Sequence, residues 1–107
     1  MSETETPSTG EREERVPLPP ASFTLLLLSL RTQAEMHLGL LRFGDGEDQP
    51  EPDLGAARHT IDLLAMLQEK TKGNLTLDEQ RLLENSLTEL RFRYVQAVED
   101  KGKQAQA

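Results

Sequence analysis

The stretch KTKGNLTLDE, residues 70–79, decides the fold because it ends one helix and begins another. Gly73 stands where a helix C-terminus needs a left-handed residue, and Lys70 and Lys72, which precede it, suit the negative end of the helix dipole. Further on, Thr76 and Glu79 form a capping-box pattern, in which the hydroxyl and the carboxylate satisfy each other's backbone N–H groups. Stop and start signals this close together predict an antiparallel helical hairpin.

Apolar residues recur at helical spacing on both sides of this turn. The helix before the turn should begin near Asp53, a candidate N-cap, and continue toward Thr71. Its apolar stripe comprises Leu54, Ala57, Ile61, Leu64 and Leu67. The helix after the turn should fray after Glu99, and its apolar residues follow at alternating steps of four and three: Leu83, Leu87, Leu90, Tyr94 and Ala97. Each helix therefore has one apolar side to bury.

The segment FTLLLLSLRTQAEMHLGLL, residues 23–41, predicts a further helix upstream of the hairpin. It follows the helix-excluding Pro-Leu-Pro-Pro at 17–20, and Ser22 is a plausible N-cap. One side of this helix carries Phe23, Leu26, Leu27, Leu30, Ala34, Leu38 and Leu41, and another side carries Leu25, Leu28, Met36, Leu40 and Phe43. A single hairpin can cover one of these sides but not both. The sequence therefore predicts an all-α three-helix domain over residues 21–100, as part of an oligomeric helical bundle.

The second apolar side of this first helix predicts self-association into a homodimer or a higher homo-oligomer. A core built from about 80 residues supplies only about 3–5 kcal/mol without disulfides, metal or oligomerisation, and the chain has no Cys. The predicted interface comprises Leu25, Leu28, Met36, Leu40, Phe43, Phe92 and Val95, with Ser29 and Gly39 allowing close approach. Two alternatives stay open: a monomer whose loops cover this side, and an apolar surface for a different, unknown protein partner.

The acidic composition bears on partners and compartment. The formal net charge is −7 and the pI about 4.8, so nucleic acid and anionic lipid surfaces are repelled on average. Residues 1–20 hold five Glu and lack a basic start followed by an apolar run, which predicts a disordered acidic tail, no secretory signal and a cytoplasmic location. Residues 101–107 predict a flexible C-terminal tail. The uninterrupted apolar run at 25–28 is too short to span a bilayer.

No residue pattern predicts an enzyme, a metal site or a cofactor site. His59 and Asp62 lie three apart on one predicted helix, but His37 is the only other imidazole, so a transition-metal site lacks ligands. The acidic loop at 43–53 lacks the ligand spacing of an EF-hand. The predicted role is a self-associating protein-interaction or scaffolding module. The alternative is a nucleic-acid- or ribosome-associated regulator that uses an Arg-rich side of the last helix, with Arg91 and Arg93.

The residues of the hairpin, ARHTIDLLAMLQEKTKGNLTLDEQRLLENSLTELRFRYV at 57–95, closely resemble the bacterial family known as domain of unknown function 1844. The resemblance lies in ARHTIDLL, in EKTKGNLT and in LRxRYV. Upstream, F-x-x-L-L-L-S-L, Gln33-Ala34 and Leu38-Gly39 are also similar. The acidic loop and the N-terminal tail fall outside it. The resemblance implies a small helical bacterial protein and no particular activity, because the family has none assigned.

Overall fold

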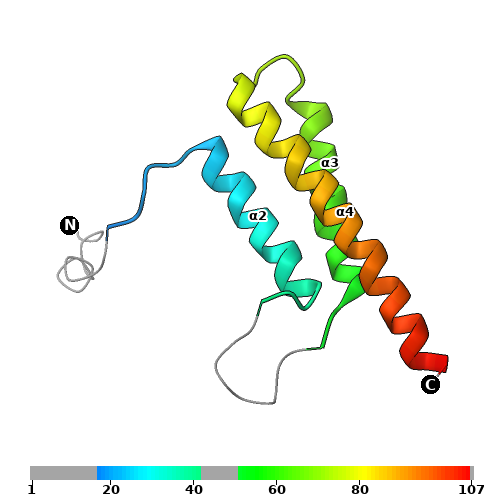
Figure 1. Ribbon diagram of the computed structural model, residues 1–107. Coiled ribbons are helices and arrows are strands. Elements are labelled where there is room, and N and C mark those ends of the chain that lie inside the picture. The colour runs from blue at the N-terminus through cyan, green and yellow to red at the C-terminus, as the bar shows by residue number, and fades with distance from the viewer. Residues whose placement is uncertain (1–16, 42–50, 107) are drawn as a thin grey trace.

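Three helices pack against one another in an up-down-up arrangement (Figure 1). The computed structural model describes residues 17–41 and 51–106. Within them, α2 spans Phe23–His37, α3 spans Leu54–Lys70 and α4 spans Leu77–Gln106, with no strand in either range. The all-α three-helix domain predicted from the sequence is thereby confirmed. The predictions for residues 1–16 of the acidic tail and for residues 42–50 of the acidic loop lie outside the described part of the chain.

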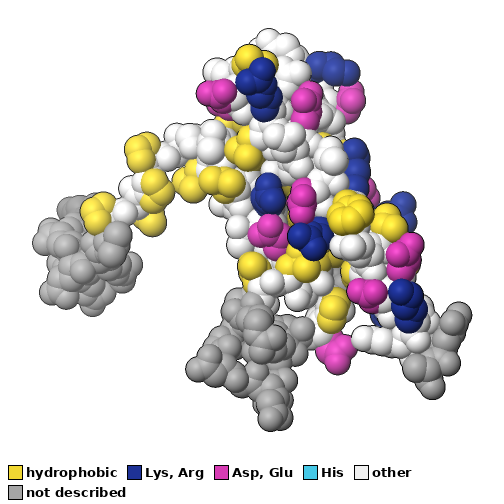
Figure 2. Space-filling model, in the orientation of Figure 1, with side chains coloured by type: hydrophobic (Ala, Val, Ile, Leu, Met, Phe, Trp, Pro, Cys, Tyr) yellow, Lys and Arg dark blue, Asp and Glu magenta, His cyan; other side chains and the backbone are white. Residues whose placement is uncertain are grey.

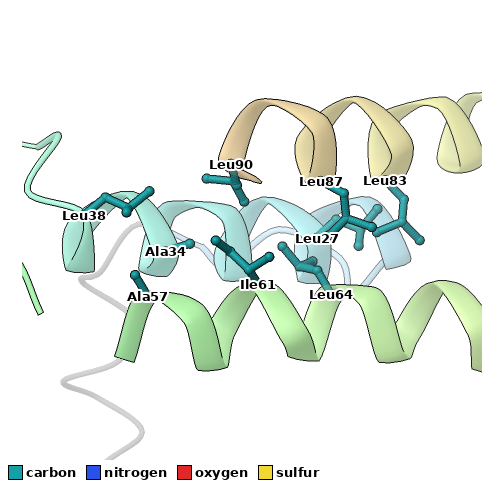
Figure 3. Close-up of a cluster of buried hydrophobic side chains, with 9 residues drawn as sticks. All are labelled: Leu27, Ala34, Leu38, Ala57, Ile61, Leu64, Leu83, Leu87 and Leu90. Carbon is teal, nitrogen blue, oxygen red and sulfur yellow. The ribbon is translucent and has the colours of Figure 1, made fainter. Parts of the chain in front are cut away.

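Each helix contributes three apolar side chains to one buried core (Figure 3). They are Leu27, Ala34 and Leu38 from the α2 segment, Ala57, Ile61 and Leu64 from α3, and Leu83, Leu87 and Leu90 from α4. Tyr94 and Ala97 pack against this core while partly exposed, as the last two members of the predicted α4 seam. The helical periodicity therefore identified the buried side of each element.

The helix starts follow the local signals that the sequence contains. The Ser22 hydroxyl accepts from the backbone N–H of Leu25 at 3.0 Å, and the Asp53 carboxylate accepts from that of Ala56 at 3.0 Å. In α4 the capping box is complete: Glu79 N–H donates to the Thr76 hydroxyl at 3.1 Å, and Thr76 N–H donates to the Glu79 carboxylate at 2.9 Å. Gly73 has φ +85°, so the predicted left-handed residue of the turn is also confirmed.

The first helix ends earlier than predicted, at His37 rather than near Leu41. Gly39 has φ +79°, and its N–H donates to the Met36 carbonyl while the Leu40 N–H donates to the Glu35 carbonyl, both at 3.0 Å. This pair of bonds is a Schellman motif, which terminates a helix at a glycine. The sequence suggested that Gly39 allows close approach of a second helix. In the structure Gly39 lies beyond the end of α2 and turns the chain.

The start of α3 fixes this corner against the end of α2. The Asp53 N–H donates to the His37 carbonyl at 2.7 Å, so one residue caps α3 through its side chain and α2 through its backbone. A Cβ added at Gly39 would lie 3.0 Å from the Pro52 Cγ, which is tighter than ordinary van der Waals contact. The corner therefore requires glycine both for its backbone angle and for its closeness to proline.

Two further details differ from the sequence prediction. Leu26, assigned to the side of the first helix that faces the hairpin, is 44% exposed. The reason is angular: Leu26 lies about 100° around the helix from the fully buried Leu27. In addition, α4 continues to Gln106 instead of fraying after Glu99. Its last turns contain Lys, Gln and Ala, which are strong helix formers, and no proline.

Candidate interaction surfaces

The two formally charged side chains of α2, Arg31 and Glu35, lie on its edge beside α4. Arg31 Nε is 3.2 Å from Glu35 Oε2, and Arg31 Nη1 donates to the Oγ of the buried Ser86 at 3.3 Å. The paired side chains are only 29% and 25% exposed. Sequence reasoning missed Ser86, although its position on the same side of α4 as Leu83 and Leu90 was a signal that it faces the core. The formal charges of α2 therefore lie on one edge, and the rest of its surface carries none.

The side of α2 that faces away from the hairpin is therefore uncharged. We call it the outer face of α2, and it comprises Leu25, Ser29, Thr32, Gln33 and Met36, with Leu26 and Leu28 beside it. The four apolar side chains among these are 37–44% exposed. The Ser29 hydroxyl donates to the Leu25 carbonyl at 2.9 Å, so its hydrogen-bonding need is met within the helix. In Figure 2 hydrophobic side chains gather where α2 begins and along the segment that leads into it.

The seven residues predicted as one oligomer interface do not share one surface. Leu25, Leu28 and Met36 belong to the exposed part of α2, at 37%, 43% and 41% exposure. Leu40 follows the helix and borders a hollow between the end of α2 and α4, because the chain has already turned at Gly39. Phe43 lies outside the described residues.

The other two predicted interface residues, Phe92 and Val95, lie on α4 and are 58% and 52% exposed. Val98, which sequence reasoning missed, is 43% exposed and continues their line. We call Phe92, Val95 and Val98 the α4 stripe. Val95 borders α3 rather than α2, at a hollow of about 170 Å³ lined by Arg58, Ile61, Asp62, Arg91, Tyr94 and Val95.

A charged strip separates the α4 stripe from the outer face of α2. It consists of Arg31 and Glu35 from α2 and of Glu89 and Arg93 from α4, which together border one hollow between the two helices. Arg93 Nε and Glu89 Oε2 are 2.9 Å apart, as their spacing of four residues predicts. Figure 2 shows basic and acidic side chains between two groups of hydrophobic ones. The outer face of α2 and the α4 stripe are therefore separate apolar surfaces.

The structure does not bring the predicted arginines together. Arg93 borders the hollow beside α2, whereas Arg91 borders the one beside α3. Two residues on a helix are about 200° apart, so Arg91 and Arg93 point to nearly opposite sides of α4. They do not form the single Arg-rich side on which the nucleic-acid alternative depended.

The described part of the chain does not bring together the side chains that the sequence offered as metal ligands. His59 is exposed, and the carboxylate of Asp62 is 4.0 Å from Arg58 Nε with both side chains about 70% exposed. Among the described residues, no group of three His, Cys, Asp or Glu side chains is placed to hold a metal ion. Within the same residues, none of the three helices is long and apolar enough to cross a membrane.

Fold and surface together define a small all-α domain, a helical hairpin with a third, apolar helix laid against it. More particularly, the chain belongs to the family called domain of unknown function (DUF1844), whose model matches residues 20–96. This match spans all of α2 and α3 and most of α4, so the resemblance seen in the hairpin and in the first helix is confirmed. It also runs through the acidic loop at 43–53, which the sequence resemblance had left out. No curated protein and no solved structure matches the chain.

Proposed function

We propose that this protein is a self-associating interaction module and that the outer face of α2 packs against the same face of a second copy. The observation that carries the proposal is the absence of charge across that face. The chain as a whole is 29% charged with a net charge of −7, yet the residues of the outer face of α2 are apolar or neutral. Two copies can therefore approach through this face without apposing like charges.

The polar groups on the face are compatible with burial. Ser29 already donates its hydroxyl proton to the Leu25 carbonyl, so burying it leaves no unsatisfied donor. Its small side chain also allows two helices to approach closely at that point. Thr32 and Gln33 are exposed, and their side chains can donate and accept hydrogen bonds across the contact. The face therefore combines large apolar side chains at Leu25 and Met36 with small or adaptable ones between them.

The size of the core supports association as well. Nine buried apolar side chains form the core of the described residues, and two of them are alanines. Small domains of this kind rarely reach more than about 3–5 kcal/mol of stability without disulfides, metal or oligomerisation. The proposed role is one of binding and not of catalysis, since the face offers apolar contact and no cluster of reactive groups.

Sedimentation equilibrium tests the proposal, because the chain mass is 12.0 kDa and a dimer has twice that. The wild-type chain should dimerise, whereas a double variant, Leu25→Glu with Met36→Glu, should stay monomeric at the concentrations at which the wild-type chain dimerises, because association through α2 would bury unpaired carboxylates. Leu77→Glu is the matched control, since Leu77 is 59% exposed and lies in the first turn of α4. Circular dichroism should show all three chains to be helical.

Two results would contradict the proposal. One is a mass of 12.0 kDa for the wild-type chain at every concentration. The other is a double variant that dimerises as tightly as the wild-type chain, which would place the contact elsewhere. A face reserved for a different protein partner would give the first of these results.

A further inference from the structure

The α4 stripe has an internal symmetry that the outer face of α2 lacks. Val95 is its central residue, with the apolar Phe92 three residues before it and Val98 three residues after it. Arg91 lies four residues before Val95 and Glu99 four residues after it, and both are exposed. About the centre, the pattern is therefore symmetric in apolar character and opposite in charge.

We propose that the α4 stripe is a second self-association surface, on which α4 of another copy lies antiparallel with Val95 at the two-fold axis. In this arrangement Val95 meets the partner's Val95. Each Arg91 comes level with the partner's Glu99, and each Phe92 comes level with the partner's Val98. Two ion pairs then flank an apolar centre at Val95.

Charge selects this orientation over the parallel one. A parallel pair of α4 helices centred on Val95 would set Arg91 beside the partner's Arg91 and Glu99 beside the partner's Glu99. The antiparallel pair replaces both repulsions with attractions. Within the described residues Arg91 forms no ion pair of its own, so its guanidinium is available to a carboxylate from another copy.

The hollow between α3 and α4 supplies a recess for the partner helix. Its volume is about 170 Å³, and Ile61 and Tyr94 provide apolar walls. The antiparallel arrangement brings the partner's Val98 to the level of Arg91 and Phe92, next to this hollow. Arg58 and Asp62 at its edge are 72% and 69% exposed, so they can move aside as the helix docks.

The α4 contact is separate from the contact proposed for α2, because the charged strip lies between them. A chain with two self-complementary surfaces on different sides assembles beyond a dimer, into a closed tetramer or an open chain. The α4 stripe offers three exposed apolar side chains, whereas the outer face of α2 and its edges offer four, so we expect the α4 contact to form at higher concentration than the one through α2.

Charge reversal at Arg91 and Glu99, singly and together, tests the α4 contact. These variants are made in the Leu25→Glu/Met36→Glu background, where α2 pairing is blocked. Sedimentation equilibrium at up to about 1 mM chain, a concentration that detects weak contacts, should show a monomer–dimer equilibrium. Arg91→Glu and Glu99→Arg should each weaken it by about tenfold, since every substitution converts two attractions into two repulsions. The double variant Arg91→Glu/Glu99→Arg should restore the affinity to within about twofold of its background. Arg81→Glu, an exposed arginine near the start of α4, is the charge control and should have little effect.

Disulfide trapping gives a second measurement in the same background, because the chain has no cysteine of its own. Val95→Cys should form a disulfide-linked dimer on mild oxidation, since a residue on a two-fold axis meets itself. Gln96→Cys, which is also exposed but about 100° around the helix, should remain monomeric. The proposal is overturned if the background shows no association up to about 1 mM, if the double charge variant is not restored, or if Gln96→Cys cross-links as well as Val95→Cys. If the wild-type chain does not pair through α2, the proposed function is refuted. The results of the charge variants and of the disulfide trapping are unaffected, because both are measured in a background that lacks α2 pairing.

Discussion

Replacement of Leu25 by alanine should weaken the proposed α2 dimer by an amount that follows from the exposure of this side chain. Leu25 is 37% exposed in the single chain, so pairing can bury no more than that part of it. Complete burial of a leucine side chain contributes about 2–3 kcal/mol, which makes the exposed part worth about 1 kcal/mol. A two-fold contact contains this residue twice, so Leu25→Ala should cost about 2 kcal/mol and raise the dimer Kd about 30-fold.

Sedimentation equilibrium over a dilution series measures this Kd directly. The matched control is Leu77→Ala, because Leu77 is 59% exposed but belongs to α4. Its Kd should stay within about twofold of the wild-type value, as substitutions at independent sites usually do. Both variants should be compared where circular dichroism shows them fully folded, since the buried part of Leu25 also stabilises the single chain.

An unchanged Kd for Leu25→Ala would refute this prediction, and so would an equally large rise in Kd for Leu77→Ala. The first result would mean that Leu25 stays exposed in the assembly. The second would mean that the loss reflects a general change of the fold. Either way the outer face of α2 would not be the contact that holds two copies together.

Four further substitutions test the fold by chemical denaturation. Leu64→Ala removes a fully buried side chain and should lower the free energy of unfolding by about 2–5 kcal/mol. Thr76→Ala removes the hydroxyl that caps α4 and should cost about 1 kcal/mol. Gly39→Ala should cost more than Gly73→Ala: both residues have positive φ, worth about 1–2 kcal/mol against alanine, but only Gly39 also has a proline in contact distance of the added Cβ. Equal losses at the two glycines would show that the contact with Pro52 relaxes without cost.

The helix caps were correctly predicted from the sequence, because they depend on residues only three or four positions apart. The N-caps at Ser22 and Asp53 and the capping box at Thr76 join groups within one turn, so the residue types and their spacing determine the geometry. The buried side of each helix was equally readable, because helical periodicity places Leu83, Leu87 and Leu90 in one line.

Features that depend on how the helices meet were not readable in the same way. The corner at Gly39 depends on Pro52 and on a bond from Asp53 to His37, which are distant in sequence. The separation of the two apolar surfaces depends on which edge of α2 lies beside α4. A helical wheel gives the angle of Phe92 on its own helix but not the position of that helix relative to α2. For this reason the single predicted interface corresponds to two separate surfaces in the structure, the outer face of α2 and the α4 stripe.

The two surfaces should respond differently to salt, and this difference tests the arrangement as a whole. Each chain carries a net charge of −7, so any association must overcome repulsion between copies. An increase from about 0.1 M to about 1 M NaCl shortens the Debye length from about 10 Å to about 3 Å, which screens that repulsion. The contact through the outer face of α2 has no charges of its own, so screening should lower its Kd.

The α4 contact gains from the same screening but loses strength in its pairs between Arg91 and the partner's Glu99. Salt should therefore tighten the α4 contact less than the α2 contact, or loosen it. The Arg91→Glu variant should reverse this difference, because its new repulsions are relieved by salt. Sedimentation equilibrium at both salt concentrations measures the two effects, and an identical response of both contacts would show that Arg91 and Glu99 do not meet across the interface.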